Sequence, residues 1–512
     1  MPPAPPDPTE AGILELAAAM AAGGLSSEEA VAACLGRIEA LNGRGPCLRA
    51  VIETNPEALA IARRLDAERR ARGPRGPLHG IPVLFKDNIG TADRMQTTAG
   101  SLALAGPPPS ADATVAARLR AAGAVLLGKA NLSEWANFRG RRSTSGWSGR
   151  GGLTRNPHVL DRSAGGSSSG SGAAVAAGFA PAALGTETDG SIVSPATACG
   201  VVGVKPTVGL TSRAGVIPIS GTQDSVGPLA RSVADAALVL AAIAAPGLDP
   251  RDAATGRPGA ADVVAALGDL PRLLEPRGLE GARIGVPRMF WGRNRHADRV
   301  AEGALEVLRR AGAVLVDPVE IPSAGDPDAG GAESEVLLHE FRAGVNAYLA
   351  GRSGLPARDL AGVIAFNEAH ADAELAYFGQ ELLVEAEARG PLTSPRYLEA
   401  LARSRASGGD RGIDAALRAE ALDALVAPTG GPAWTSDLLT GDHGTAGSCS
   451  LAARAGYPLV SVPAGEVWGL PVNVTFMGPA FGDHRLLRLA HAFQIAAGAL
   501  RRPRFLPTAP LP

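Results

Sequence analysis

Two serine-containing segments carry the residue types that acyl-transfer chemistry needs. The first, Gly165-Gly-Ser-Ser-Ser-Gly-Ser-Gly172, leads into the apolar run Ala173–Ala177, and the second, Gly185-Thr-Glu-Thr-Asp-Gly-Ser191, begins 13 residues later. By composition the first segment is also compatible with a flexible Gly/Ser linker. The apolar run requires burial, however, and hydroxyl and N–H groups at a helix start can bind developing negative charge. In the second segment, small residues allow consecutive N–H groups to converge, as an oxyanion hole requires.

A serine nucleophile also needs a general base, and none of the eight histidines is placed for that role by a motif. Lys86 is the alternative because it directly follows the apolar run Gly80–Phe85, which has strand character. A lysine at the end of a strand is usually a surface residue. If Lys86 is buried instead, the loss of hydration lowers its pKa toward neutrality and makes the amine a competent base.

Other motif matches are weaker. Gly123 to Lys129 fits half of a phosphate-binding loop, but Ala130 replaces the Ser/Thr that binds magnesium, and the intervening residues are apolar. Gly166–Gly170 fits the nucleophile elbow of α/β-hydrolases, but a loop precedes it where a buried strand is needed. The histidines show no zinc-binding spacing. We therefore predict no metal and no cofactor.

Composition excludes several classes of protein. The 512 residues carry 49 Lys and Arg against 51 Asp and Glu, so there is no bulk charge to attract nucleic acid or an anionic membrane. A hydrophobic fraction of 46% excludes global disorder. The four cysteines lack disulfide or metal spacing, which favours buried thiols. The start of the chain does not resemble a signal peptide, and no apolar run is long enough to span a membrane. These features predict a cytoplasmic protein.

Helical and strand patterns alternate along the chain, which predicts one large α/β domain. We expect a disordered Pro-rich lead-in over residues 1–8 and a single domain over residues 9–508, with a catalytic core at about 75–245 and a surface excursion at about 246–280. The predicted helices are 13–22, 27–41, 55–72, 114–122, 232–245, 297–311, 335–350, 368–388, 412–424 and 485–497. The predicted strands are 81–85, 124–127, 283–286, 313–316, 424–426 and 472–476.

Taken together, four segments resemble the amidase signature family of serine hydrolases. They are GIPVLFKDNI (80–89), GGSSSGSGAAVAAG (165–178), GTETDGSIVSPA (185–196) and GVVGVKPTVGL (200–210). Residue identity and spacing agree over some 130 residues, which makes the joint match specific. The resemblance implies the amidase signature fold, in which many α-helices cover a large twisted mixed β-sheet within a single large domain.

The resemblance also implies a metal-independent Ser-Ser-Lys triad. Ser191 matches the acylated nucleophile, Lys86 matches the terminal base, and Ser167 matches the bridging serine, which in the family follows a cis peptide bond, here Gly166–Ser167. The oxyanion would be held by the N–H groups of Thr188, Asp189, Gly190 and Ser191.

Within the family the chain looks most like bacterial peptide amidases, which remove the C-terminal amide of peptides. SEWANFRG (133–140), TETDGSIV (186–193) and the late segment 364–386 carry this likeness. A broad small-molecule or aryl amidase is the alternative. The glutamine-hydrolysing subunit of a transfer-RNA amidotransferase is disfavoured, because many such subunits read Gly-Gly-Ser-Ile-Arg where this chain reads Asp189-Gly-Ser-Ile-Val193. We expect an amide substrate, no nucleic-acid or membrane partner, and a monomer or homodimer.

Overall fold

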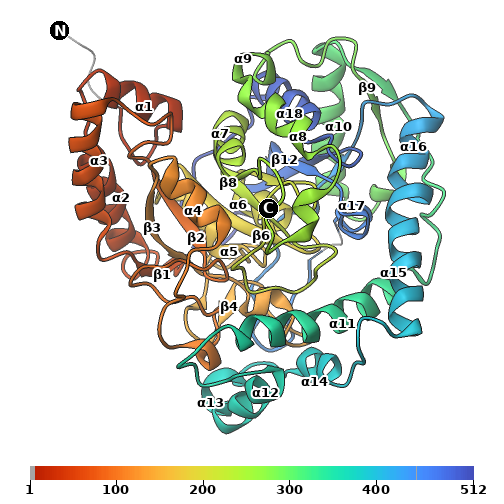
Figure 1. Ribbon diagram of the computed structural model, residues 1–512. Helices are drawn as coiled ribbons and strands as arrows, with labels where there is room; N and C mark the ends of the chain where they lie inside the picture. The colour runs from red at the N-terminus through yellow and green to blue at the C-terminus, as the bar shows by residue number, and fades with distance from the viewer. Residues whose placement is uncertain (1–5, 445–446, 512) are drawn as a thin grey trace.

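A mixed sheet of eleven strands organises the fold of the computed structural model, which describes residues 6–444 and 447–511 (Figure 1). Its strand order is β1-β3-β2-β6-β8-β7-β12-β13-β11-β9-β10. The strands are β1 Val51–Thr54, β2 Pro82–Lys86, β3 Val125–Ala130, β6 Ala182–Glu187, β7 Val202–Lys205, β8 Ser225–Ala230, β9 Arg283–Gly285, β10 Val314–Val316, β11 Ala424–Pro428, β12 Leu459–Val467 and β13 Leu470–Met477, while β4 Trp147–Ser148 and β5 Gly152–Leu153 form a separate hairpin.

Helices cover both faces of this sheet. Figure 1 places α1–α3 beside one end of the sheet, α11–α14 along the bottom and α15–α16 beside the far end. The helices are α1 Ile13–Ala21, α2 Ser27–Leu41, α3 Ala58–Arg72, α4 Thr114–Ala121, α5 Ser169–Ala176, α6 Val193–Cys199, α7 Val233–Ile243, α8 Ala260–Gly268, α9 Leu270–Leu273, α10 Arg295–Arg310, α11 Ala329–Ala350, α12 Leu360–Ala369, α13 Ala371–Glu374, α14 Glu381–Glu387, α15 Pro395–Gly408, α16 Asp414–Ala419, α17 Ser450–Ala455 and α18 Asp483–Ala497. The predicted fold class, a large mixed sheet with many helices in one large domain, is confirmed.

Strand β2 lies inside the sheet and is buried on both sides. It pairs in parallel with β3 and β6. Val83 and Phe85 belong to the core cluster that includes α4 and α7 side chains, whereas Leu84 belongs to the cluster that includes α2, α3 and α5 side chains. Because successive side chains of a strand alternate between faces, Lys86 follows Leu84 toward the face that α5 covers.

Several strands were missing from the sequence prediction. The strands β6, β7 and β8 lie in the region rich in Gly, Ser, Thr and Ala, and β12 also went unrecognised. β6 reads Ala-Ala-Leu-Gly-Thr-Glu and is buried throughout, so it shows neither the period-two alternation nor the β-branched residues that indicate a strand. A further difference concerns the predicted helix 368–388, which is interrupted and forms parts of α12, α13 and α14.

The expected surface excursion at about 246–280 contains two short helices, α8 and α9. Val263, Leu267 and Leu273 are buried in the same core cluster as α7. This segment is therefore more regular than its content of Gly, Asp and Pro suggested, because its few apolar residues recur at helical spacing and pack inward.

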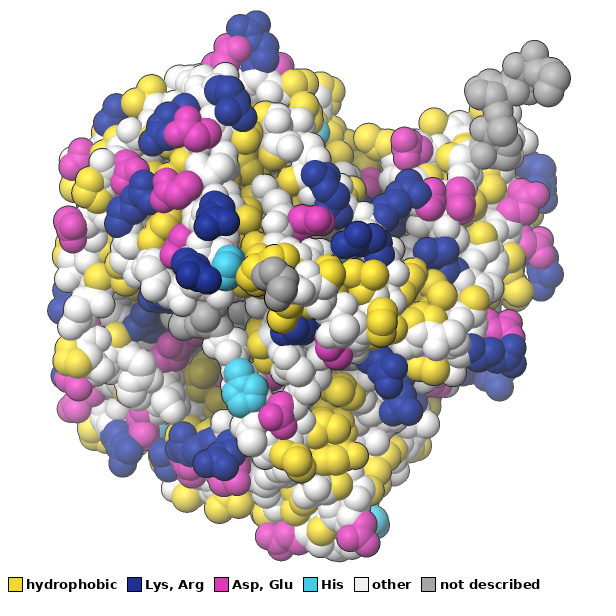
Figure 2. Space-filling view, turned by 180° about the vertical axis from the view of Figure 1, so that it is seen from behind, with side chains coloured by type: hydrophobic (Ala, Val, Ile, Leu, Met, Phe, Trp, Pro, Cys, Tyr) yellow, Lys and Arg dark blue, Asp and Glu magenta, His cyan; other side chains and the backbone are white. Residues whose placement is uncertain are grey.

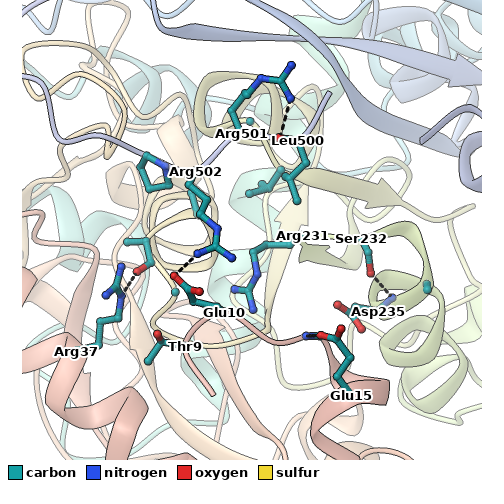
Figure 3. Close-up of a pocket in the computed structure, with 18 of the residues that line it drawn as sticks. Thr9, Glu10, Glu15, Arg37, Arg231, Ser232, Asp235, Leu500, Arg501 and Arg502 are labelled. Carbon is teal, nitrogen blue, oxygen red and sulfur yellow. Dashed lines mark hydrogen bonds and ion pairs between the residues drawn. The ribbon is translucent and has the colours of Figure 1, made fainter. Parts of the chain in front are cut away.

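Residues 9–15 and 500–503 meet at a cavity of about 450 Å³ (Figure 3). Asp235 Oδ1 accepts a hydrogen bond from Ile13 N at 2.8 Å, Arg231 donates to the carbonyl oxygen of Ala11 at 2.7 Å, and Arg502 forms an ion pair with Glu10. Of the predicted lead-in 1–8, residues 1–5 lie outside the described residues. The side chain of Asp7 accepts a hydrogen bond from Thr9 N, and its carbonyl oxygen accepts from Ala11 N.

We expect Asp235→Ala to lower the free energy of unfolding by about 1–3 kcal/mol, since a buried carboxylate that receives the first N–H of α1 is lost. Chemical denaturation with circular dichroism measures this change. Glu15→Ala is the matched control, because Glu15 receives a hydrogen bond from Gly12 N at the exposed side of the same helix start. Equal effects of the two variants would contradict the assigned role of Asp235.

Figure 2 shows the face opposite to that of Figure 1, where Lys and Arg side chains are interspersed with Asp and Glu and the lower half is hollowed. Within residues 6–444 and 447–511, no helix is both long and apolar enough to cross a membrane.

Candidate active site

Lys86 is the last residue of β2, and its side chain is fully buried. Its Nζ donates to Ser167 Oγ at 2.7 Å, and it also donates to Thr186 Oγ1 at 2.8 Å and to the carbonyl oxygen of Thr186 at 3.1 Å. Asn88 Nδ2 donates to the same threonine hydroxyl at 2.9 Å. The structure thus brings together Lys86 and Ser167, which lie 81 residues apart in the sequence.

Ser167 lies two residues before α5, and the Gly166–Ser167 peptide bond is cis, as the resemblance implied. Glycine is required at position 166, because a Cβ there would lie only 2.4 Å from Ser133 Oγ. The Gly/Ser segment is therefore the buried start of a helix and not a linker. The loop before it confirms that Gly166–Gly170 is no nucleophile elbow.

Residues 188–191, here called the oxyanion loop, connect β6 to α6. The carboxylate of Glu187 accepts hydrogen bonds from Ile192 N at 2.6 Å and Val193 N at 3.0 Å, which fixes the start of α6. Gly190 has a φ of 83°, a left-handed conformation that favours glycine. Among the hydrogen bonds of the described residues, none has a main-chain N–H of the oxyanion loop as its donor. These four groups are therefore available to an acceptor that enters the site.

Ser191 ends the oxyanion loop and is 8% exposed. Its carbonyl oxygen accepts a hydrogen bond from Ser168 N at 3.0 Å, so the two serine segments lie against each other. Thr188 Oγ1 donates to Asp224 Oδ1 at 2.5 Å, which anchors the other end of the loop. All six residues predicted for the site, on three separate segments, therefore lie around the end of β2 and β6.

The electrostatic environment of Lys86 suits a base. Burial lowers the pKa of its ammonium group to about 7, although the nearby Asp224 and Glu187 carboxylates oppose this effect. At neutral pH a substantial fraction of Lys86 is therefore an uncharged amine, whose two N–H groups can donate to the oxygens of Thr186 and whose lone pair can accept from Ser167 Oγ, while an ordinary surface lysine stays protonated.

Two other lysines are fully buried, but they contact different groups. Lys129 Nζ donates to Ile89 O and Thr97 Oγ1, and Lys205 Nζ donates to the carbonyl oxygen of Tyr457. Lys129 lies within β3, so the phosphate-loop match ending there is a buried strand, in agreement with our interpretation. Among the described residues, only Lys86 combines full burial with a serine hydroxyl partner.

The comparison with protein families agrees with this geometry. The family model described as Amidase matches residues 29–487. This chain belongs to the amidase signature family. A probable amidase of Arabidopsis thaliana is 41% identical over 92% of this chain and 87% of that protein. A glutamyl-tRNA(Gln) amidotransferase subunit from an Anaeromyxobacter strain is 37% identical over 96% of this chain and 97% of that protein.

Solved structures of amidase signature proteins superpose closely. The native peptide amidase of Stenotrophomonas maltophilia is 52% identical, with a TM-score of 0.90 over 97% of this chain and 99% of that one. The peptide amidase in complex with the competitive inhibitor chymostatin gives a TM-score of 0.92 at the same identity and coverage. The likeness therefore extends over nearly the whole of both chains.

Several residues of this amidase site were not predicted. Thr186 accepts from Lys86, Asp224 anchors Thr188, and Glu187 fixes the start of α6. Thr186 and Glu187 lie within a quoted motif, but their partners depend on which strands are neighbours in the sheet. Asp224 is brought to the oxyanion loop by the turn before β8, a strand that the sequence did not reveal.

Among the described residues, no group of three or more His, Cys, Asp or Glu side chains is arranged to hold a metal ion. The four cysteines are free thiols, of which Cys34 and Cys199 are buried.

Proposed function

We propose that this amidase hydrolyses primary carboxamides through the triad Ser191, Ser167 and Lys86 and that its preferred substrate is the C-terminal amide of a peptide. The contact between Lys86 Nζ and Ser167 Oγ at 2.7 Å carries the proposal, because it joins a buried amine to the serine expected to relay a proton. Likeness to peptide amidases over nearly the full chain supports the substrate class.

In the proposed reaction, Ser191 Oγ attacks the amide carbonyl carbon. Its proton passes to Ser167, whose own proton passes to neutral Lys86. The carbonyl oxygen becomes an oxyanion, which accepts hydrogen bonds from the N–H groups of the oxyanion loop. The relay then returns a proton to the departing nitrogen as the C–N bond breaks, and ammonia leaves an acyl ester on Ser191. Water attacks this ester by the same relay and releases the carboxylic acid.

A panel of substrates tests the substrate class. Ammonia release is measured with an amidated dipeptide, benzamide, an aliphatic amide and free glutamine, and aniline release with an anilide. We expect the largest kcat/KM for the amidated dipeptide, with its internal peptide bond left intact. A preference for the anilide or benzamide would replace the peptide assignment with an aryl or broad amidase. Hydrolysis of glutamine alone would instead assign the chain to a transfer-RNA amidotransferase.

The pH dependence follows from the pKa of Lys86. Because the neutral amine is the active form, kcat/KM is expected to rise about tenfold per pH unit below pH about 7 and to level off above it. Initial rates at saturating and limiting substrate between about pH 5 and 8 measure the acidic limb. Circular dichroism over the same range controls for unfolding. A flat profile would contradict Lys86 as the base, as would a limb near the ordinary pKa of lysine, about 10.4.

A further inference from the structure

The loop after β11 lies against the chain that leads into the Gly/Ser segment. We call residues 433–444 the outer loop. The carbonyl oxygen of Trp434 accepts a hydrogen bond from Ser163 N at 2.7 Å, and Ser436 N donates to the carbonyl oxygen of Asp161 at 3.0 Å. These contacts place the outer loop beside the Gly/Ser segment, although more than 260 residues separate the two in the sequence.

The chain after the outer loop reaches the other serine segment. A Cβ on Gly190 would lie 3.0 Å from Cys449 Sγ, and Ser450 Oγ donates to Asp189 Oδ2 at 2.8 Å. A cavity of about 470 Å³ lies here beside the oxyanion loop, and the residues that line it include Asp189, Cys449 and Glu333 of α11. The chain between β11 and the start of α17 therefore contacts both segments that carry a proposed catalytic serine.

Asp442 joins the outer loop to Ser145. Its Oδ2 accepts a hydrogen bond from Ser145 Oγ at 2.6 Å, and its Oδ1 accepts from Ser145 N at 3.0 Å and from Trp434 Nε1 at 3.0 Å. Asp442 is exposed, whereas Ser145 is buried. Hydrogen bonds to an ionised carboxylate are stronger than those between neutral groups, so this single side chain fixes Ser145 relative to the outer loop.

The side chain of Ser145 lies directly on Gly166. A Cβ on Gly166 would be 2.8 Å from Ser145 Oγ and 3.0 Å from Ser145 Cβ. Ser133 packs on the same glycine, its N–H donates to the carbonyl oxygen of Ser167 at 3.0 Å, and its Oγ accepts from Gly146 N at 2.9 Å. Ser133 and Ser145 thus form the seat of the peptide unit that precedes the bridging serine.

We propose that Asp442 is a positioning residue for the bridging serine. It holds Ser145 against Gly166, and this contact keeps Ser167 Oγ within reach of Lys86 Nζ. The inference rests on the proposed function, because it assumes that Ser167 relays the proton. Without the carboxylate, Ser145 loses two hydrogen bonds and is free to move away from Gly166. Misplacing a reacting group by about 1 Å can cost on the order of 10²-fold in rate.

The test compares Asp442→Ala and Asp442→Asn with the wild-type enzyme on the amidated dipeptide. We expect Asp442→Ala to lower kcat by at least about tenfold and to leave KM within about twofold, because Ser167 takes part in the reaction and not in binding. In Asp442→Asn the amide oxygen can accept from Ser145 N and Trp434 Nε1, and the amide nitrogen can donate to Ser145 Oγ. This variant should therefore keep kcat within about threefold of the wild type.

Asp437→Ala is the matched control. Asp437 belongs to the same loop, but its carboxylate accepts hydrogen bonds from Leu439 N at 2.8 Å and Thr440 N at 3.0 Å, both within the loop. Its removal should leave kcat nearly unchanged. Equal losses of kcat in Asp437→Ala and Asp442→Ala would mean that general loosening of the loop is the cause, and this would overturn the proposal. A wild-type kcat in Asp442→Ala would overturn it as well.

A double variant separates this inference from the proposed function. Ser167→Ala alone should lower kcat by on the order of 10³-fold or more. Because Asp442 acts through Ser167, the variant that combines Ser167→Ala with Asp442→Ala should match Ser167→Ala within about twofold. A further tenfold loss in the double variant would overturn the inference and leave the relay intact. Wild-type rates in Ser167→Ala would instead reject the relay itself, and with it the role of Asp442.

Discussion

Ser191→Ala is expected to lower kcat for the amidated dipeptide by on the order of 10⁶-fold. The hydroxyl of Ser191 is the proposed nucleophile. Ser191 is the one serine among residues 188–191, whose main-chain N–H groups are proposed to bind the oxyanion. Ser191 Oγ has no hydrogen-bond partner among the described residues. Its removal should therefore change the free energy of unfolding by less than about 0.5 kcal/mol. Ammonia release and chemical denaturation measure the two quantities on the same sample.

Ser194→Ala is the matched control for this variant. Ser194 lies three residues further on, in the first turn of α6, and its hydrogen bond to the loop, as far as the described residues show, is the one from its main-chain N–H to Gly190 O. It should keep nearly the wild-type rate. A second readout is mass spectrometry with a slowly hydrolysed substrate, which should detect an acyl adduct on the wild type and none on Ser191→Ala. An active Ser191→Ala enzyme would exclude Ser191 as nucleophile.

Lys86→Met is expected to lower kcat by about 10⁴–10⁶-fold, because methionine fills a similar volume but supplies no lone pair for the proton of Ser167. Lys129→Met controls for the loss of a buried ammonium group. Lys129 is equally buried and burial lowers its pKa to about 8, but its contacts are Ile89 O and Thr97 Oγ1. This control should retain turnover while its stability changes.

The rise of kcat/KM with pH on the acidic side distinguishes two roles that Lys86 could have, which are to accept a proton and to hold Ser167 in place. If the lysine served only to hold Ser167 in place, a charged ammonium group would serve as well as a neutral amine, and the rate would not rise through pH about 7. Comparable losses in Lys86→Met and Lys129→Met would mean that the effect comes from the protein core and not from the relay.

The candidate site residues that the sequence singled out, and that the structure brings together, are those whose chemistry is unusual for their position. Lys86 follows an apolar run, and several serines lie at the start of a predicted helix. Both features can be recognised in the sequence without knowledge of the fold. The outer helices and the strands β2, β3, β9 and β11 were also predicted, since their apolar residues recur at the expected spacing. These patterns predicted an α/β domain, whereas the large mixed sheet was implied by the resemblance to the amidase signature family.

The contacts that hold the site in place could not be predicted. Glu333 lies more than 140 residues from Asp189 in the sequence, although both line one cavity. Gln223, which donates to Glu333 Oε1, precedes a strand that shows no alternation because both of its faces are buried. A buried Glu on a long amphipathic helix looks the same in sequence as a solvated one. The arrangement of the sheet and its helices in space is needed to show that Asp224 contacts the oxyanion loop and that Glu333 lines the cavity beside it.

The proposed triad and the wall of the neighbouring cavity come from different parts of the chain. Lys86, Ser167 and Ser191 lie on β2, before α5 and before α6, whereas the cavity beside the oxyanion loop is walled mainly by the end of the loop before α11, α11 itself and the start of α17. Substitutions in residues 289–333 and 447–454 can therefore reshape this wall without moving a group that transfers a proton. The residues that shape this cavity and the residues proposed to carry out the reaction can therefore change independently of each other during evolution.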